Sequence, residues 1–562
     1  MSVSSSSDAA AFEKQTPLSR VHFDLTLRRF SGQERFALGV VTTLALLVRA
    51  WVQHHRIFWG DEIGTLNYIK ESPGYLLSHF NAHLTMNYFI LAEKWIAWLC
   101  GAADWRLTLL PLAGAVATIP LTASLALKFT GSTRVALIAA GLAASNPFLI
   151  YWGPIIRSYS LLVAFSLLAI DEFLHWYHQR DWWSGGRCAA AVFLLLLTHI
   201  NGVYTVAFLV LLLVIEAVSR GWSGGRKFLW ESKTLWIPLA GTAVVIAVAY
   251  WRLLPDIAKV AKDWGTAPPP TSMGYLPLLF SLYMGAGYLA FVVAPLLLAG
   301  VWSGTQAQRP LLLLCLAIIL GPVLMSLQGV SVYPNEPRYL IFSLPLLLIL
   351  LAEGIDWLAR HIRIRQGAAA TAWGLTALIV LGWTPVVLRA PSAANGHRVY
   401  VHVAKFLHAE LRKGDVVVAR WADGFTLSQF FGNAKSFILM PDQYVKRVAS
   451  RLDTSPRGRV FYITSPGDLK GRMARVRNFG HIEVAIYSGA TERALLQEWR
   501  EDLLVRTAGR IAASFYNDYQ LLALIDDLLP SDQPPDHWRC LAERCAAPSP
   551  IQRSLHPPLL FP

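Results

Sequence analysis

The hydrophobic residues of this chain are gathered into long runs, and short polar segments separate the runs. A helix needs roughly 20 apolar residues to cross the hydrocarbon core of a bilayer. The runs predict eleven transmembrane helices, at about 36–53, 107–127, 135–151, 158–176, two within 188–218, and then 236–254, 275–300, 311–328, 339–359 and 368–389. The predicted fold class is a polytopic α-helical membrane protein with a transmembrane domain over 36–390.

The stretch 188–218 decides the orientation of every later segment. A single helix of 31 residues would be about 46 Å long, whereas the hydrocarbon core is about 30 Å thick. We therefore predict two short spans with a turn at 199–202, where His, Asn and Gly interrupt the apolar run. Two spans place the basic segments 220–233 and 360–365 on the same side as the N-terminal tail 1–35, which is also basic. The positive-inside rule assigns that side to the cytoplasm of a bacterial inner membrane.

The first loop on the outer side, 54–106, contains an apolar stretch at 85–100 with Glu93 and Lys94 near its centre. Charged side chains in the middle of a membrane span are costly. We therefore expect this stretch to form an amphipathic helix at the membrane surface rather than a further span.

A second domain follows the last predicted span. From residue 391 onward, short β-branched runs alternate with helical stretches, the runs being 415–420, 436–440, 459–464 and 482–487. Strands that alternate with helices predict a small α/β domain over 391–562. With eleven spans before it, this domain faces the periplasm, where oxidising conditions would allow Cys540 and Cys545 to form a disulfide.

Composition excludes a soluble nucleic-acid-binding protein. Charged residues make up 15% of the chain and apolar residues 54%, whereas soluble domains carry about 25% charged residues. The net charge of +14 comes from Lys and Arg that lie largely between the apolar runs, which is typical of membrane topology signals. Membrane lipids, and no nucleic acid, are the predicted partners.

An acidic pair, Asp61 and Glu62, follows the first predicted span within the segment FWGDE. A sugar hydroxyl is a poor nucleophile until a positioned carboxylate accepts its proton. Asp61 is the predicted general base, and Glu62 is predicted to orient it or to contact the acceptor. The alternative interpretation is the solvated end of a loop.

Two arginines are candidates for binding a lipid phosphate. Arg157 lies with Tyr159 in the turn before the fourth span, and Arg338 lies at the outer end of the tenth span. The planar guanidinium binds phosphate oxygens through two parallel hydrogen bonds and stays charged. The alternative is an interfacial arginine that reaches the phospholipid head groups. The predicted topology places Asp61, Arg157 and Arg338 on one side of the membrane.

Several histidines could contribute to this site. Four of them surround the acidic pair in the sequence: His54, His55, His79 and His83. Together with the acids they could bind a divalent cation, but their spacing matches no known metal motif, so no metal ligand is assigned. His83 and His199 are candidates for binding the sugar or the acceptor. His199 and Asn201 are equally suited to buried, hydrogen-bonded positions.

Several motifs occur in the order found in one enzyme family. They are FWGDE after the first span, RL at 106–107, NPFLIYW before RSYSLL, TH at the end of the fifth span, and RYLIFSLPLLLIL. Together they resemble the GT-C glycosyltransferases. The similar members are bacterial relatives of the dolichyl-phosphate-mannose–protein mannosyltransferases and of lipid A aminoarabinose transferase. The resemblance covers about 55–360, and the domain after 390 is similar to the periplasmic domain that many of these enzymes carry.

The resemblance implies a polyprenyl-phosphate sugar donor, an inverting transfer and an acid in the first outer loop. Asp61 matches that acid, and Arg157 matches an arginine suited to the donor phosphate. These relatives often carry His-Pro-Pro in the same loop, whereas His83 is followed here by Leu84 and Thr85. The class of envelope acceptor therefore stays open between a lipid, a glycan and a protein.

A transporter and a non-catalytic scaffold are the alternatives to a glycosyltransferase. A membrane transporter of a lipid-linked or small polar substrate would often show repeated halves and ionisable groups inside its spans. Here the notable charges gather at one interface, next to a long outer loop. A non-catalytic envelope scaffold is the second alternative, and the intact Asp61–Glu62 pair favours an enzyme over it.

Overall fold

The computed structural model contains two compact units. It describes residues 29–55, 60–69, 71–78, 87–101, 105–253, 275–284, 289–303, 337–362, 367–393 and 396–411, five strands between 416 and 487, and the single residues 255, 311 and 427. One unit, the helical unit, comprises Met1–Arg56 and Thr65–Ala393. The other, the α/β unit, comprises Ile57–Gly64 and Ala394–Pro562.

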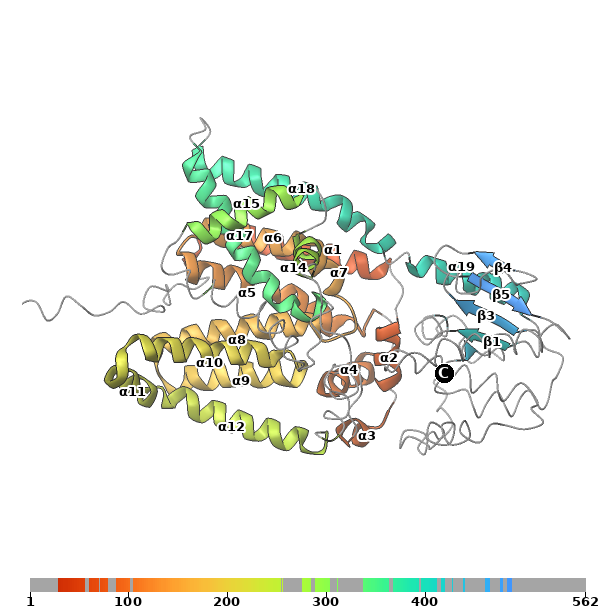
Figure 1. The fold of residues 1–562 in the computed structure, drawn as a ribbon, viewed down its shortest axis with the longest axis horizontal. Helices are drawn as coiled ribbons and strands as arrows, with labels where there is room; N and C mark the ends of the chain where they lie inside the picture. Colours follow the sequence, from red (N-terminus) through yellow and green to blue (C-terminus); the bar gives the residue numbers. More distant parts are fainter. Residues whose placement is uncertain are drawn as a thin grey trace, which may run out of the picture. The chain divides into compact units, whose positions relative to one another are not determined.

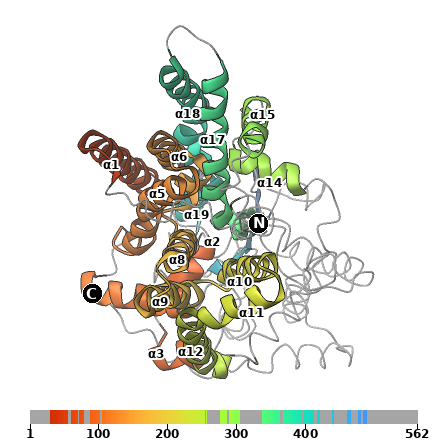
Figure 2. The same ribbon diagram turned by 90° about the vertical axis from the view of Figure 1, so that its left-hand side faces the viewer.

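The helical unit is a row of packed helices (Figure 1). Its main helices are α1 Gly32–His54, α4 Asn87–Cys100, α5 Leu109–Thr130, α6 Thr133–Ser145, α7 Pro147–Trp152, α8 Tyr159–Gln179, α9 Trp182–Thr198, α10 Gly202–Ser219, α11 Gly221–Glu231, α12 Lys233–Tyr250, α14 Tyr275–Met284, α15 Leu289–Trp302, α17 Leu344–His361 and α18 Gly367–Ala393. Shorter elements are α2 Gly60–Ile69, which begins in the α/β unit, α3 Pro73–Ser78, and the 3-10 helices η2 Trp251–Leu253 and η4 Pro337–Ser343. Six of the helices pack one against the next in space, in the order α12, α9, α8, α5, α6 and α17 (Figures 1 and 2).

Local signals fix where several helices begin and end. Ser31 caps α1, because its Oγ accepts a hydrogen bond from the Glu34 N–H while the Glu34 carboxylate accepts one from the Ser31 N–H. Asp181 caps α9 by accepting from the N–H of Ser184 over 2.8 Å. The helix α8 ends at Gln179, and the residue that caps its C-terminus, Arg180, has a left-handed backbone with φ of 58°. The Arg180 guanidinium lies over the ring of Tyr177 at 4.2 Å, so packing holds this less favourable conformation.

The fold class agrees with the prediction from the sequence. Seven helices in the described part of the chain are long and apolar enough to cross a membrane. The predicted turn at 199–202 is confirmed, because α9 ends at Thr198 and α10 begins at Gly202. The total of eleven spans stays a prediction, since most of 311–328 lies outside the described residues.

The structure corrects two predicted boundaries. The single span expected at 135–151 is two helices, α6 and α7, with a break at Asn146. Pro147 has no N–H to continue α6, and the Asn146 side chain accepts hydrogen bonds from the first N–H groups of α7. The span expected at 275–300 contains α14 and α15, and residues 285–288 between them lie outside the described part. The segment 220–233, expected as a loop, contains the helix α11.

The helix expected at 85–100 is present as α4, Asn87–Cys100, and its place at the membrane surface stays a prediction. At 14 residues it is too short to span a bilayer, which needs roughly 20 residues. One face buries Asn87, Ile90 and Glu93, and the other exposes Trp95 and Trp98. Burial raises the pKa of Glu93 to about 9, so this side chain is a neutral acid at pH 7.

Exposed tryptophans lie at both ends of the helical unit. At the end where α8 finishes, the exposed indoles include Trp182, Trp183, Trp222 and Trp230. At the end where α8 begins, they are Trp51, Trp95, Trp98, Trp105 and Trp251. Between the two ends, exposed side chains such as Val210, Val214, Val244 and Val245 are aliphatic. Two aromatic belts around an aliphatic zone are typical of a surface that faces lipid.

We call the two ends of the helical unit the Lys128 end and the Arg157 end. At the Lys128 end, cations are paired with carboxylates: Lys128 with Asp171, Arg134 with Asp356, Arg187 with Glu172, Arg220 with Glu216, and Arg360 with Glu353 and Asp356. Ion pairing offsets the cost of burying these groups. At the Arg157 end, the Arg338 guanidinium lies against the rings of Trp152, Tyr159 and Tyr339.

The α/β unit has a mixed sheet and its own core. The strands are β1 Val416–Ala419, β2 Ile438–Leu439, β3 Val460–Thr464, β4 Val476–Asn478 and β5 Glu483–Tyr487, in the order β2-β1-β3-β5-β4. β1 is parallel to both β2 and β3, whereas β5 is antiparallel to β3 and β4. Residues of helix α19 (Gly396–Glu410) share a buried cluster with Val417, Phe461 and Val484. The four predicted strands are therefore present, and β4 is a strand that the sequence pattern did not reveal.

Candidate functional site

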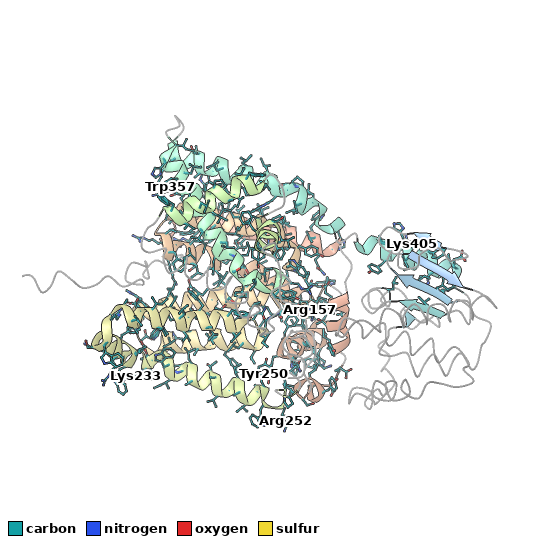
Figure 3. The ribbon with its side chains drawn as sticks, viewed as in Figure 1. Arg157, Lys233, Tyr250, Arg252, Trp357 and Lys405 are labelled. Carbon is teal, nitrogen blue, oxygen red and sulfur yellow. The ribbon has the colours of Figure 1, made fainter. Side chains whose placement is uncertain are left out.

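Five side chains from distant parts of the sequence meet at the Arg157 end of the helical unit. Arg157 and Tyr159 lie at the start of α8, His199 lies in the turn between α9 and α10, and Arg338 and Tyr339 lie in η4. Figure 3 shows Arg157 at this end, opposite Lys233 and Trp357. The structure thus brings together four of the predicted site residues, Arg157, Tyr159, His199 and Arg338, and adds Tyr339.

The loop that carries Arg157 is held by the helices around it. A Cβ atom on Gly153 would lie 2.9 Å from the Cβ of Ala115, so this close approach of α7 to α5 requires glycine. The buried Arg49 side chain donates hydrogen bonds to the carbonyls of Ala143 and Ala144 over 3.1 and 3.0 Å. These contacts join α1, α5 and α6 beneath the loop and fix its starting point.

The turn between α9 and α10 both orients His199 and anchors η4. The backbone N–H of Asn201 donates to Nδ1 of His199 over 3.1 Å. The side-chain amide of Asn201 donates to the carbonyl of Tyr339 over 2.9 Å. Because Nδ1 accepts, the neutral imidazole carries its proton on Nε2, and this nitrogen is the available donor.

His199 is electrically neutral over the whole physiological range. Its side chain is 1% exposed, and burial, followed by the positive charges of Arg157 and Arg338, lowers its pKa to about 3. The same effect shows that both guanidinium groups lie close enough to act on the imidazole. His199 therefore supplies an N–H donor between two cations without adding a third charge.

Aromatic rings form the frame of this cluster. The Tyr159 ring centroid lies 5.8 Å from His199, 6.1 Å from Tyr339 and 5.5 Å from Trp152. The Arg338 guanidinium lies 5.1 Å from the ring of Tyr339 and 5.3 Å from that of Trp152. Cation–π attraction of this kind holds the arginine without neutralising its charge.

The polar groups of the cluster are mainly hydrogen-bond donors. They comprise two guanidinium groups and the Nε2–H of His199. The hydroxyl of Ser158, next to Arg157, is fully buried and has no hydrogen-bond partner among the residues that the structure describes. Such a set suits an anion with several oxygens, and phosphate is the anion that guanidinium groups bind through two parallel bonds. We call this set of residues, Arg157, Ser158, Tyr159, His199 and Arg338, the cationic cluster.

The acidic pair lies in a different unit of the structure. Asp61 and Glu62 occupy the first turn of α2 and belong to Ile57–Gly64, which groups with the α/β unit. Glu62 is buried, whereas the side chain of Asp61 lies outside the described part. The prediction that they lie on the same side of the membrane as Arg157 therefore stays a prediction.

The other histidine and metal predictions remain without a structural test. His79 and His83 lie outside the described residues, as do Cys540 and Cys545. His54 and His55 stack edge to face at the end of α1, with ring centroids 5.1 Å apart. In the part of the chain that the structure describes, no group of three or more His, Cys, Asp or Glu side chains could hold a metal ion.

Sequence reasoning missed three contributors to the cluster: Trp152, Ser158 and Tyr339. Each lies inside a quoted motif, namely NPFLIYW, RSYSLL or RYLIFSLPLLLIL, but none carries a charge that would mark it. Trp152 and Arg338 are far apart in the chain, and their contact follows from the packing of α7 and η4 at one end of the bundle. The signal in the sequence that could have identified these three residues is their place in the quoted motifs.

Comparison with known proteins gives a fold but no sequence relative. No protein-family model matches the chain, and no curated protein matches its sequence. The crystal structure of ArnT from Cupriavidus metallidurans in the apo state superposes with a TM-score of 0.53 at 14% identity, covering 80% of this chain and 97% of that one. The same enzyme bound to undecaprenyl phosphate gives 0.51 at 14% identity, covering 80% and 98%. Part of the chain also aligns with the Pmt1-Pmt2 protein O-mannosyltransferase complex of S. cerevisiae, where a TM-score of 0.32 is too low to indicate a common overall fold. This chain therefore has the fold of the solved ArnT structures.

Proposed function

We propose that this protein is a glycosyltransferase that takes a sugar from a polyprenyl-phosphate donor, with the donor phosphate bound by the cationic cluster. The observation that carries the proposal is the convergence of Arg157, Arg338 and the Nε2–H donor of His199 at one end of a GT-C fold. The solved ArnT structure of the same fold holds undecaprenyl phosphate, which supports a lipid phosphate as the ligand class.

The cluster would act on the leaving group. When the bond between sugar and phosphate breaks, negative charge grows on the phosphate oxygens. Guanidinium groups that are already in place stabilise this charge without reorganising. The neutral His199 adds a hydrogen bond of fixed direction, because Asn201 holds its Nδ1. The frame of Tyr159, Tyr339 and Trp152 excludes water, which strengthens these interactions.

A carboxylate would activate the acceptor. We assign Asp61 as the general base that removes the proton from the acceptor hydroxyl, and Glu62 as the residue that orients the base or the acceptor. Attack by the activated hydroxyl on the face opposite the phosphate would invert the configuration at the sugar carbon. His83 is the further candidate for contacting the sugar or the acceptor, which is a lipid, a glycan or a protein of the envelope.

The proposal also implies which side of the membrane each end of the helical unit faces. Basic segments at the Lys128 end, including Arg226 and Lys227 in α11, favour the cytoplasm for that end. The Arg157 end and the domain 391–562 would then face the periplasm of a bacterial inner membrane. A lipid-linked donor flipped to that face would reach the cluster from the outer leaflet.

The test is turnover of donor by the full-length protein in lipid vesicles. A panel of polyprenyl-phosphate sugars is supplied, and release of free polyprenyl phosphate is measured with and without envelope extract as acceptor. Arg157→Gln is expected to abolish release, while Arg252→Gln, which removes an exposed arginine in η2 at the same end, is the matched control. Movement of donor across the vesicle membrane without release of sugar would favour the transporter alternative, and no effect of either change would contradict the proposed site.

A further inference from the structure

The helix α11 and the start of α12 form an amphipathic surface at the Lys128 end. α11 packs closely on α10, because a Cβ on Gly225 would lie 2.4 Å from the carbonyl oxygen of Ala217, and it buries Phe228 on the same side. Its other side exposes Trp222 at 87% and Trp230 at 75%. Arg226 lies four residues from each of them, so the guanidinium emerges between two indoles on one helix face.

A hollow lies beside this arginine. It has a volume of about 530 Å³ and is lined by Arg226, Leu229, Trp230 and Trp236. Trp236 belongs to α12, so the hollow lies at the junction of two helices. Its lining combines one cation with three apolar side chains.

An apolar strip continues from the hollow along α12. Lys233, Ile237, Val244 and Val248 are spaced so that they share one face of this helix. The last three are 57%, 63% and 72% exposed. Lys233 therefore stands at the head of an aliphatic strip, near the end of the unit where Figure 3 labels it.

Two cations of this surface, Arg226 and Lys233, differ from their neighbours in how they are paired. Other cations nearby have carboxylate partners, such as Arg220 with Glu216 and Lys227 with Glu231. Arg226 and Lys233 form no ion pair with any residue that the structure describes. A cationic head, flanking indoles and an aliphatic strip are complementary to an anionic phosphate headgroup, its ester region and its acyl chains, respectively.

We propose that α11 and the first turn of α12 bind one anionic glycerophospholipid of the leaflet at the Lys128 end. Arg226 holds the phosphate through its planar fork, with Lys233 adding a second positive charge. Trp230 and Trp236 lie at the level of the ester groups, and the acyl chains follow Ile237, Val244 and Val248. This site lies at the opposite end of the helical unit from the cationic cluster and does not depend on the proposed transferase activity.

The experiment measures lipid binding by the full-length protein in detergent. Native mass spectrometry follows the bound lipid during titration with phosphatidylglycerol and, separately, with phosphatidylcholine. Arg226→Gln is expected to weaken phosphatidylglycerol binding about fivefold, as expected for one cation near a lipid phosphate, and to leave phosphatidylcholine binding unchanged. The affinity of Arg226→Lys for phosphatidylglycerol should lie between that of Arg226→Gln and that of the parent. The lysine keeps the positive charge but loses the planar fork.

Lys227→Gln is the matched control, since it removes the same charge from the same helix at a residue that pairs with Glu231. It should bind phosphatidylglycerol as the parent does. An equal loss in both variants would mean that the surface responds to net charge alone, and the site would be rejected. Unchanged binding by Arg226→Gln would also overturn the proposal. Arg226 is exposed, so its replacement should leave the thermal midpoint of the protein unchanged.

Discussion

The backbone N–H of Asn201 donates a hydrogen bond to Nδ1 of His199 over 3.1 Å. This contact decides which nitrogen of the imidazole carries the proton, and the amide of the same asparagine holds η4 through the carbonyl of Tyr339. One residue in a short turn thus sets the direction of a donor and the position of the element that carries Arg338.

The buried state of His199 predicts how stability depends on pH. Its pKa in the folded protein is lowered to about 3 from 6.5, so below about pH 6.5 the unfolded chain binds a proton that the folded chain does not. The contribution of His199 to the free energy of unfolding is therefore fully present above pH 6.5, and it is lost as the pH falls toward 3. Between pH 7 and pH 5 the loss is about 2 kcal/mol. Denaturant unfolding at both pH values should show a smaller loss for His199→Gln than for the parent. His55→Gln, which changes an exposed histidine, should retain the parent's loss, and equal behaviour of all three proteins would contradict the prediction.

Replacing Arg157 by lysine tests the shape of the phosphate contact. The charge is kept, but the planar fork that binds two oxygens is lost. One charge-assisted hydrogen bond contributes about 1.5–3 kcal/mol, so donor use should fall about tenfold or more. Initial rates at several donor concentrations measure the change, with Arg252→Lys as the control. If Arg157→Lys uses the donor at the same rate as the parent, Arg157 is an interfacial anchor and does not bind the phosphate.

Exchanging each acid of the pair for its amide tests the general base. Asp61→Asn keeps the size of the side chain and removes its charge, so transfer should fall by about 10²–10⁴-fold. Glu62→Gln should cost less. Sugar transfer is measured across pH at matched protein levels, because two neighbouring carboxylates can titrate as a coupled pair. If Glu62→Gln alone were inactive, the base would be Glu62, and activity in both variants would show that the pair is structural.

The orientation of the chain can be tested with reporters. A C-terminal alkaline phosphatase fusion should be active, and a C-terminal fluorescent protein that folds only in the cytoplasm should be dark. The physical reason is the gathering of basic segments at the Lys128 end. The same pair of reporters fused after Arg226 should give the opposite pattern. A fluorescent C-terminal fusion would place the domain 391–562 in the cytoplasm and would change the number of spans.

Length and charge were sufficient to predict much of the bundle. The turn at 199–202 followed from the thickness of the bilayer, and α9 and α10 meet there in the structure. The break at Asn146 was missed because an apolar run containing one proline still averages as hydrophobic. The helix α11 was missed because its Gly and basic residues read as a loop, whereas packing of Phe228 and the tight contact at Gly225 stabilise a helix there.

The candidate site was predictable only in part, for a physical reason. Arg157 and Arg338 were identified from their charge at a predicted interface, and one topology placed both on the same side. The role of His199 depends on burial between those two cations, which follows from tertiary packing. Trp152 and Tyr339 acquire their role by lying against Arg338, a contact that no local pattern encodes.

The cationic cluster has a consequence for handling the protein. Arg157 and Arg338 both act on one buried imidazole, so two like charges lie near the same side chain in the folded protein, and their repulsion costs stability. A bound lipid phosphate would add negative charge beside them, and a ligand that binds only the folded state raises stability with its concentration. The carrier lipid would then be part of what keeps the bundle folded, and detergent extraction that strips it would weaken the protein before any substrate is consumed.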